Sequence, residues 1–325
     1  MAKINNNKTA FTLGEEIFGP LILSFCSFIH DIVLKNKLEH LIFFSRDMRL
    51  VMDSYKILYG NHIQSFYFHV SRKSLEAVEE CSDQKKAFLS YMKQAGFFLH
   101  CGFVDIGWQG QIQFKLERII KDSEIKTELP FGIYFGKFNT LESLCGKEHV
   151  VSFLNSGKVL PAKFQTLNRS IEAFFSAQEN KTVGYRSDSS PIFEVDSRYT
   201  EGIKSFQQGA LAYIKKVKQE NVVYTSKKYV ETSVTNFLRF LIYPTLEEIS
   251  FFEKDSFEDG KTIKMFERKE NFNEFFRNIT NITWKGAYFR VNNKSFLLYR
   301  LYMFIGGIRL RCINTRKIRK IKNAI

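Results

Sequence analysis

Short apolar runs alternate with amphipathic stretches along the first part of the chain. Runs that are closed by polar residues or glycine predict buried strands. We expect four such strands, at residues 41–44, 65–70, 102–106 and 131–135. Apolar positions with helical spacing predict helices between and before them. These helices are expected at residues 20–35, 48–59, 72–80, 83–95 and 111–121.

Strands that alternate with helices predict an α/β fold with a parallel sheet and right-handed crossovers. Ligands bind to such sheets at the carboxyl ends of the strands. Three polar loops fall at this edge, at residues 45–47, 71–72 and 105–110. Their coincidence predicts a binding site there.

The character of the sequence changes after about residue 180. Residues 187–191 are typical of a turn or linker, and helical patterns follow at 201–219, 227–242, 264–278 and 295–308. We therefore expect an α/β core over 1–185, a mostly helical region over 186–308 and a polybasic tail over 309–325.

Positive charge is concentrated at the end of the chain. The net charge is +14, and half of it lies in the last 17 residues, which hold seven Lys and Arg and no acid. The rest is only mildly basic, so we expect no nucleic-acid partner. A polybasic tail favours peripheral contact with anionic lipid, although a solubilising tail would have the same composition.

Cysteine usage and the chain start favour a cytoplasmic location. The five cysteines form no CxxC pair and their number is odd, which predicts neither a zinc site nor a disulfide framework. The first ten residues are polar and predict no secretory signal. The apolar stretch 296–308 is too short to span a bilayer, which takes roughly 20 residues.

The segment 103–113, FVDIGWQGQIQ, has the composition of a phosphate cradle. Its strand ends at Asp105, and Gly107 and Gly110 flank Trp108 and Gln109 before a helix that starts at Gln111. Glycines let backbone N–H groups approach an anion, and a helix N-terminus adds unpaired donors. The alternative is an ordinary turn in which Asp105 caps the helix.

Two further loops carry arginine at neighbouring strand ends, as Ser45-Arg46-Asp47 and Ser71-Arg72. Arginine offers a bidentate fork for phosphate oxygens. Asp47 could hold Mg²⁺, directly or through water, or orient a nucleophile. The alternative for the first loop is a surface Arg–Asp pair that begins a helix.

Together, FFSRD, VSRKS and VDIGWQGQIQ, with GPLI upstream, resemble a domain encoded in bacterial polysaccharide and O-antigen clusters, which is often fused to a phosphatase of the haloacid dehalogenase superfamily. The resemblance covers residues 14–180 well and the remainder loosely. Met48 stands where that family has glycine, and Val104 stands where type I phosphoribosyltransferases have a second acid.

The resemblance implies a glycan phosphoribosyltransferase with a type I phosphoribosyltransferase-like core. Such an enzyme moves ribose 5-phosphate from phosphoribosyl pyrophosphate (PRPP) to a sugar hydroxyl and releases pyrophosphate, before a separate phosphatase leaves a ribofuranose. The acceptor would be a lipid-linked or oligosaccharide glycan of O-antigen or capsule. The C-terminal helical region would lie on the acceptor side, and the enzyme would be cytoplasmic or peripheral on the inner membrane.

The resemblance also implies individual roles. Asp105 would hold the ribose hydroxyls, and the Ser45, Arg46 and Asp47 loop would hold pyrophosphate and Mg²⁺. Ser71 and Arg72 would add contacts with pyrophosphate. The 5-phosphate would be cradled by Gly107, Trp108, Gln109, Gly110 and Gln111.

The acceptor hydroxyl needs a base, which contributes about 10²–10⁴-fold in rate. Asp47 is the first candidate and Glu172 the second. Glu172 follows the core and could face the acceptor, but a solvated helix carboxylate has the same pattern.

Three rival functions make different demands on the sequence. A dehalogenase-type phosphatase needs a DxD pair after the first strand, where this chain has Asp47-Met48-Arg49. Because no DxD occurs anywhere in the sequence, we expect neither that phosphatase nor a metal-binding nucleotide-sugar glycosyltransferase. The non-enzymatic alternative is an RNA-binding or membrane-scaffold protein that acts through its basic tail.

Overall fold

The computed structural model describes most of the chain and divides it into two compact units. The helical unit comprises Met1–Cys26, Arg169–Phe174 and Arg198–Leu301. The sheet unit comprises Ser27–Asn168, Phe175–Ser197 and Tyr302–Ile325. The described residues are 9–123, 125, 130–138, 150–154, 166–196, 198, 200–221, 226–258, 262–269, 272–295 and 297–306.

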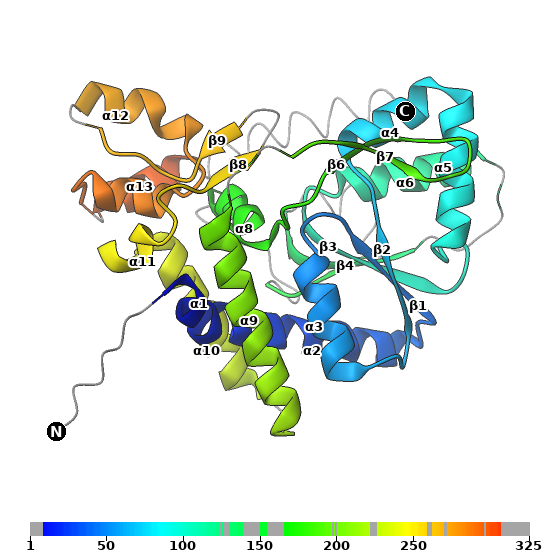
Figure 1. The fold of residues 1–325 in the computed structure, drawn as a ribbon, viewed down its shortest axis with the longest axis horizontal. Coiled ribbons are helices and arrows are strands. Elements are labelled where there is room, and N and C mark those ends of the chain that lie inside the picture. The colour runs from blue at the N-terminus through cyan, green and yellow to red at the C-terminus, as the bar shows by residue number, and fades with distance from the viewer. Residues whose placement is uncertain are drawn as a thin grey trace. The chain divides into compact units, whose positions relative to one another are not determined.

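The sheet unit is built on a five-stranded, all-parallel sheet with the order β2-β1-β3-β4-β5 (Figure 1). This finding confirms the α/β fold and its parallel sheet. The order is that of flavodoxin-like doubly wound sheets, in which ligands bind where the strand order reverses, between β1 and β3. The strands are β1 His40–Phe44, β2 Gln64–Phe68, β3 Cys101–Trp108, β4 Phe131–Lys137 and β5 Val150–Ser152.

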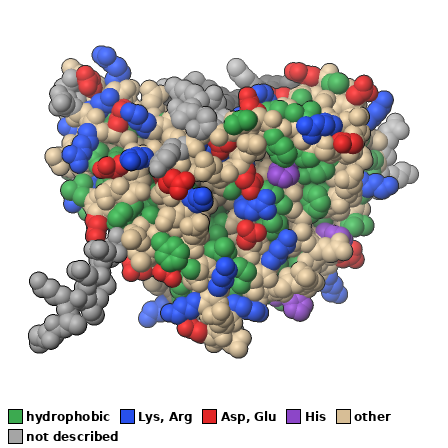
Figure 2. Space-filling view, viewed as in Figure 1, with side chains coloured by type: hydrophobic (Ala, Val, Ile, Leu, Met, Phe, Trp, Pro, Cys, Tyr) green, Lys and Arg blue, Asp and Glu red, His purple; other side chains and the backbone are tan. Residues whose placement is uncertain are grey.

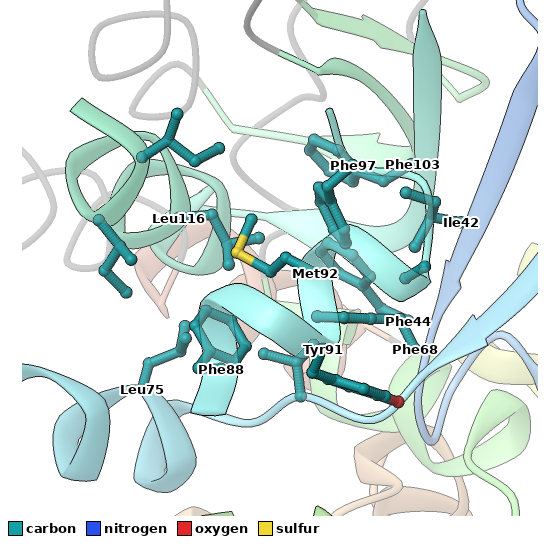
Figure 3. Close-up of a cluster of buried hydrophobic side chains, with 14 of the residues drawn as sticks. Ile42, Phe44, Phe68, Leu75, Phe88, Tyr91, Met92, Phe97, Phe103 and Leu116 are labelled. Carbon is teal, nitrogen blue, oxygen red and sulfur yellow. The ribbon is translucent and has the colours of Figure 1, made fainter. Parts of the chain in front are cut away.

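Helices cover both faces of this sheet. One face bears Ile42, Phe44 and Phe103 and packs against α4, α5 and α6 (Figure 3). On the other face, Phe43 meets Tyr55 of α3 with ring centroids 6.0 Å apart, and His30 of α2 lies 3.1 Å from the Tyr55 hydroxyl. The helices are α2 Gly19–Asn36, α3 Arg49–Tyr59, α4 Arg72–Glu80, α5 Ser82–Gln94 and α6 Gln111–Lys121.

Aromatic rings fill the core between the sheet and α4–α6. Phe44 stacks on Phe103 at 4.8 Å, and Phe68 stacks on Tyr91 at 4.6 Å. Each fully buried side chain of this size contributes about 1.5–3 kcal/mol relative to exposure. This packing holds the carboxyl ends of β1, β2 and β3 in fixed register, with Ile42 opposite both Phe66 and Phe103.

A hairpin of β6 Lys181–Tyr185 and β7 Pro191–Glu194 completes the sheet unit. Its turn closes with a hydrogen bond from the Arg186 amide to the Ser190 carbonyl, at 2.8 Å. The turn expected at 187–191 is therefore a hairpin turn, and the boundary expected near residue 185 falls between two paired strands.

The helical unit confirms the expected helical C-terminal region. Gly14 and Gly209 let its helices approach closely, because a Cβ would lie 2.0 Å from the Phe206 carbonyl oxygen at Gly14 and 1.9 Å from that of Phe11 at Gly209. Its elements include α1 Ala10–Leu13, the π-helix η1 Gly14–Phe18, α9 Glu201–Gln219, α10 Lys227–Ile242, α11 Leu246–Ser250, α12 Phe272–Asn278, the 3-10 helix η3 Ile279–Asn281 and α13 Lys285–Val291.

The helix expected at 264–278 is wrong over its first half. Thr262–Lys264 is strand β9, which pairs with β8 Ser256–Glu258, and the helix α12 covers only Phe272–Asn278. The short strand β5 and the helix α8 Asn168–Phe175 were not predicted either. The polybasic tail lies outside the described residues.

Among the described residues, one helical stretch is long and apolar enough to cross a membrane, at Ala10–Asn36. Of its most apolar window, 61% is buried inside the protein. A buried core helix passes the same test, so length and composition do not assign this stretch to a membrane.

Candidate functional site

Asp47 follows β1 and Asp105 lies within β3, and the two acids are close enough for their charges to interact. Burial, together with the charge of Asp47 and against the opposing amides of Ile106 and Gly107, raises the pKa of the Asp105 carboxyl to about 7. Both carboxyls are half-buried. The two acids that the sequence singled out therefore lie near each other at the edge where the strand order reverses.

The first loop is fixed to the end of β2. The Ser45 amide donates to the Phe68 carbonyl at 2.9 Å, and the Val70 amide donates to Ser45 Oγ at 3.3 Å. The Ser45–Arg46 peptide bond is cis. Ser45 thus joins two neighbouring strand ends, which places Asp47 and the segment after β2 at one edge.

Arg46 lies beside a buried acid. Its Nη1 is 3.4 Å from Asp196 Oδ2, and the Arg46 and Asp196 side chains are only 15% and 3% exposed. The same nitrogen lies 3.4 Å from the Glu179 carbonyl oxygen. An anion at this loop would therefore have to compete with Asp196 for the guanidinium.

Ser71 and Arg72 have different environments. Ser71 is the N-cap of α4, where its Oγ accepts from the Ser74 amide at 3.0 Å and donates to the Thr182 carbonyl at 2.6 Å. This hydroxyl has a structural role in the described conformation. Arg72, in the first turn of α4, is exposed.

The glycine segment Gly107–Gly110 begins inside β3, because Gly107 and Trp108 pair with Gly136 and Lys137 of β4. The loop expected at 105–110 is therefore strand up to Trp108, and only Gln109 and Gly110 separate β3 from α6. The segment adopts conformations that favour glycine. Gly107 has φ +96°, and a Cβ there would lie 2.4 Å from the Gly136 carbonyl oxygen. Gly110 is left-handed and is the N-cap of α6, where, as a glycine, it provides no side-chain cap for the first amides of that helix. Gln111 Nε2 donates to Gln109 Oε1 at 3.0 Å. This geometry suits an anion cradle made by the backbone.

Trp108 packs its ring into the protein. It has φ +76° and is buried, with its ring against Gly136 and 5.3 Å from that of Phe138. Its indole Nε1 has no hydrogen-bond partner among the described residues. The Trp108 ring is therefore inside the protein, and its role in holding phosphate stays a prediction.

Lys137 is a basic residue at this edge that the sequence reasoning missed. It ends β4, opposite Trp108 in the register, and is buried. The expected strand stopped at residue 135, which left Lys137 outside the motif. A predicted strand that continued to residue 137 would have placed Lys137 beside Gly107 and Trp108.

Glu179 was not predicted either, and it binds two residues that lie near the carboxyl ends of β1 and β2. Its Oε1 lies 2.7 Å from Arg49 Nε, and its Oε2 accepts from the Tyr67 hydroxyl at 2.7 Å. The Arg49 guanidinium also stacks over the Tyr67 ring at 3.8 Å. No local pattern marks Glu179, because its partners lie more than 100 residues away.

The charge of Asp47 acts both on Tyr67, the partner of Glu179, and on Asp105. This charge helps to raise the pKa of Tyr67, although burial and the nearby Glu179 have larger effects. It also raises the pKa of Asp105. We call Asp47, Arg49, Tyr67, Asp105 and Glu179 the edge cluster.

His69 lies next to the edge cluster. Its ring packs edge-on against Tyr67 and Phe193, at 5.1 and 5.0 Å, and its Nδ1 is buried without a hydrogen-bond partner among the described residues. Burial lowers the His69 pKa, and Arg49 lowers it further against the opposing charge of Glu179. Burial therefore favours the neutral imidazole, which has a nitrogen that can accept a proton.

The remaining candidate base, Glu172, lies on α8 within the helical unit. The other predicted site residues belong to the sheet unit. The role of Glu172 stays a prediction.

Two residues of the edge cluster, Asp47 and Asp105, could hold a magnesium ion jointly with phosphate. Among the described residues, no three His, Cys, Asp or Glu side chains gather as a complete metal site. Mg²⁺ is commonly bound by one or two carboxylates together with substrate phosphates. Asp47 and Asp105 supply such a pair, and a cation would relieve the repulsion between their charges.

No protein-family model matches the chain, and no curated protein is significantly similar to it. The site is therefore interpreted from its own chemistry. On the face drawn in Figure 2, basic and acidic side chains are interspersed. A continuous field of one sign, which a nucleic-acid backbone would require, does not cover that face.

Proposed function

We propose that the protein is a Mg²⁺-dependent glycan phosphoribosyltransferase, which moves ribose 5-phosphate from PRPP to a sugar hydroxyl of a bacterial polysaccharide. One observation carries this proposal: at the edge where the strand order reverses, the charge of Asp47, which follows β1, acts on Asp105, which lies in β3 shortly before Gly107, Gly110 and the start of α6. The acids at this edge can bind ribose hydroxyls and a metal ion. The backbone amides beside them can bind a phosphate.

The parts of PRPP differ in the groups that they need. The 5-phosphate needs donors, which the amides after Gly107 and at the start of α6 supply. The ribose hydroxyls need acceptors, which Asp105 of β3 supplies. The pyrophosphate lies next to Asp47 in this arrangement, where bound Mg²⁺ would neutralise its charge.

The reaction breaks the bond between ribose C1 and pyrophosphate and forms a bond from C1 to the acceptor oxygen. Its transition state has oxocarbenium character, so catalysis relies on positioning and electrostatic stabilisation. The acceptor proton must pass to a base. Asp47 is one candidate, and the neutral imidazole of His69 beside the edge cluster is another.

Arg49 favours transfer over dehalogenase-type phosphatase chemistry. Arg49 stands where a dehalogenase-type phosphatase has its second acid, and it pairs with Glu179. Arg46 is held by Asp196 and would have to exchange that partner for pyrophosphate. Removal of the 5-phosphate after transfer is therefore assigned to a companion phosphatase.

A binding experiment tests this proposal before any acceptor is known. PRPP with Mg²⁺ should raise the melting temperature of the protein, since a ligand at 100 times its Kd stabilises the folded state by about 2.7 kcal/mol, or a few degrees. Asp105→Asn should abolish the shift, whereas the exposed control Asp83→Asn should keep it.

The reaction itself is tested by mass spectrometry of lipid-linked and oligosaccharide acceptors after incubation with PRPP. The expected product is a phosphoribosylated glycan that Asp105→Asn does not make. If PRPP with Mg²⁺ neither shifts the melting temperature nor yields product, while another phosphosugar or a nucleotide sugar does, the phosphoribosyl assignment is wrong.

A further inference from the structure

The helix Leu297–Gly306 buries one side and exposes apolar residues on the other. Tyr299 and Met303 are buried, at 2% and 3% exposure. Four large apolar residues point outward, with exposed fractions of 75% for Leu297, 53% for Leu301, 61% for Phe304 and 56% for Ile305.

The spacing of the exposed residues defines a continuous stripe. Positions 297, 301, 304 and 305 follow the i, i+4, i+7, i+8 pattern of a single helix face. Scattered exposed apolar residues are normal on a protein surface, but a contiguous stripe marks an interaction surface. We call these four residues the apolar stripe.

The charge around the apolar stripe points to one kind of partner. From Lys294 onward, in the part of the sequence that contains the apolar stripe, the chain holds nine Lys and Arg residues and no acid. One of them, Arg300, is exposed on the same helix, and seven follow Gly306. A surface that combines apolar contact with negative charge complements this composition, and an anionic lipid membrane has both properties.

We propose that the apolar stripe and the basic segment after it attach the protein to the surface of an anionic membrane. The helix lies in the interface, because its ten residues are too few to span a bilayer. The four side chains enter the boundary between headgroups and acyl chains, and the basic residues bind the lipid charge. Stable attachment usually takes two such signals together. This inference does not depend on the proposed transferase activity.

Vesicle co-sedimentation of the full chain tests the proposal. The protein should bind phosphatidylcholine vesicles that contain about one third phosphatidylglycerol, bind pure phosphatidylcholine vesicles weakly, and lose affinity as salt rises. The double variant Leu301→Ser, Phe304→Ser should weaken binding about tenfold or more. Leu34→Ser, at another exposed apolar position, should bind as the wild type does.

Circular dichroism and the melting temperature establish that the double variant is folded, as expected for exposed positions. Unchanged vesicle binding of the folded double variant would overturn the proposal. It would also be overturned if the wild type bound neither vesicle and instead formed a dimer that the double variant abolished. Sedimentation velocity without lipid detects that dimer, and the apolar stripe would then be a contact between two copies of the chain.

Discussion

Arg49 Nε lies 2.7 Å from Glu179 Oε1, and this ion pair joins the first turn of α3 to a loop 130 residues further along the chain. The other carboxylate oxygen of Glu179 accepts the Tyr67 hydroxyl. With both oxygens engaged, Glu179 has a fixed position beside His69. Its negative charge and the positive charge of Arg49 then act on the imidazole in opposite directions.

Substitutions of this ion pair should move the His69 pKa in opposite directions. Glu179→Gln removes a charge that raises the pKa, so the pKa should fall further below its ordinary value of about 6.5. Arg49→Gln removes a charge that lowers it, so the pKa should rise. A titration of the His69 ring resonances by NMR measures both.

Glu194→Gln provides the control, because Glu194 is exposed, pairs with Lys73 and lies on the strand that carries Phe193. This variant should leave the His69 titration nearly unchanged. A shift of the same sign in the Glu179 and Arg49 variants would mean that packing, and not charge, sets the His69 pKa.

The interaction between Asp47 and Asp105 can be measured in the same way. Asp47→Asn should lower the Asp105 pKa from about 7, although burial, the larger cause, will keep it above the ordinary value of about 3.9. Carbon-detected NMR of the side-chain carboxyls follows the titration. Asp53→Asn on α3 should have little effect. An unchanged Asp105 pKa in Asp47→Asn would mean that the two acids do not share a site.

Local patterns predicted the parallel sheet and the edge that bears the acids. Asp47 and Asp105 end or follow apolar runs, and parallel strands bring such positions together whatever the details of packing. The partners of these loops could not be predicted, since the contacts of Arg46 with Asp196 and of Arg49 with Glu179 span at least 130 residues.

Short patterns also had more than one structural solution. Ser71 follows a strand, as expected for a ligand contact, but its hydroxyl caps α4 and donates to the β6 backbone. Trp108 lay inside the expected cradle, but its large apolar ring is more stable inside the protein than in water. The apolar positions at 264–278 fitted a helical period, yet those at its start belong to a short strand.

Gly107 should be sensitive to substitution for two reasons that can be separated. Gly107→Ala introduces a Cβ at a positive φ and places it 2.4 Å from the Gly136 carbonyl oxygen. Gly60→Ala has the same backbone problem, at φ +66°, but no atom lies within 4 Å of its Cβ. Left-handed strain costs about 1 kcal/mol, and overpacking adds about 1–3 kcal/mol.

Urea unfolding of the two variants measures this difference. Gly60→Ala should lower the free energy of unfolding by about 1 kcal/mol, and Gly107→Ala should lower it by about 2–4 kcal/mol. Equal losses would show that the glycine segment can move away from β4. It would then be a poor candidate for a fixed anion cradle.

Asp255 should make the stability of the protein depend on pH between about 4 and 6. Its carboxylate accepts the Gly202 and Ile203 amides at 3.1 and 2.7 Å, at the start of α9. Burial nevertheless raises its pKa to about 6, from an unfolded value of about 3.9. The folded state therefore holds this proton more tightly, and the resulting stabilisation is complete below about pH 4 and lost as the pH rises through about 6.

Asp255→Asn isolates this contribution, because every other titrating group is common to both proteins. The melting temperature of the wild type minus that of Asp255→Asn should fall from pH 4 to pH 7. The exposed Asp188 has a lowered pKa, caused mainly by hydrogen bonds from Ser190, so the corresponding difference for Asp188→Asn should rise as the pH rises. If the Asp255 difference also rose, the amides at the start of α9 would stabilise the carboxylate more than burial destabilises it.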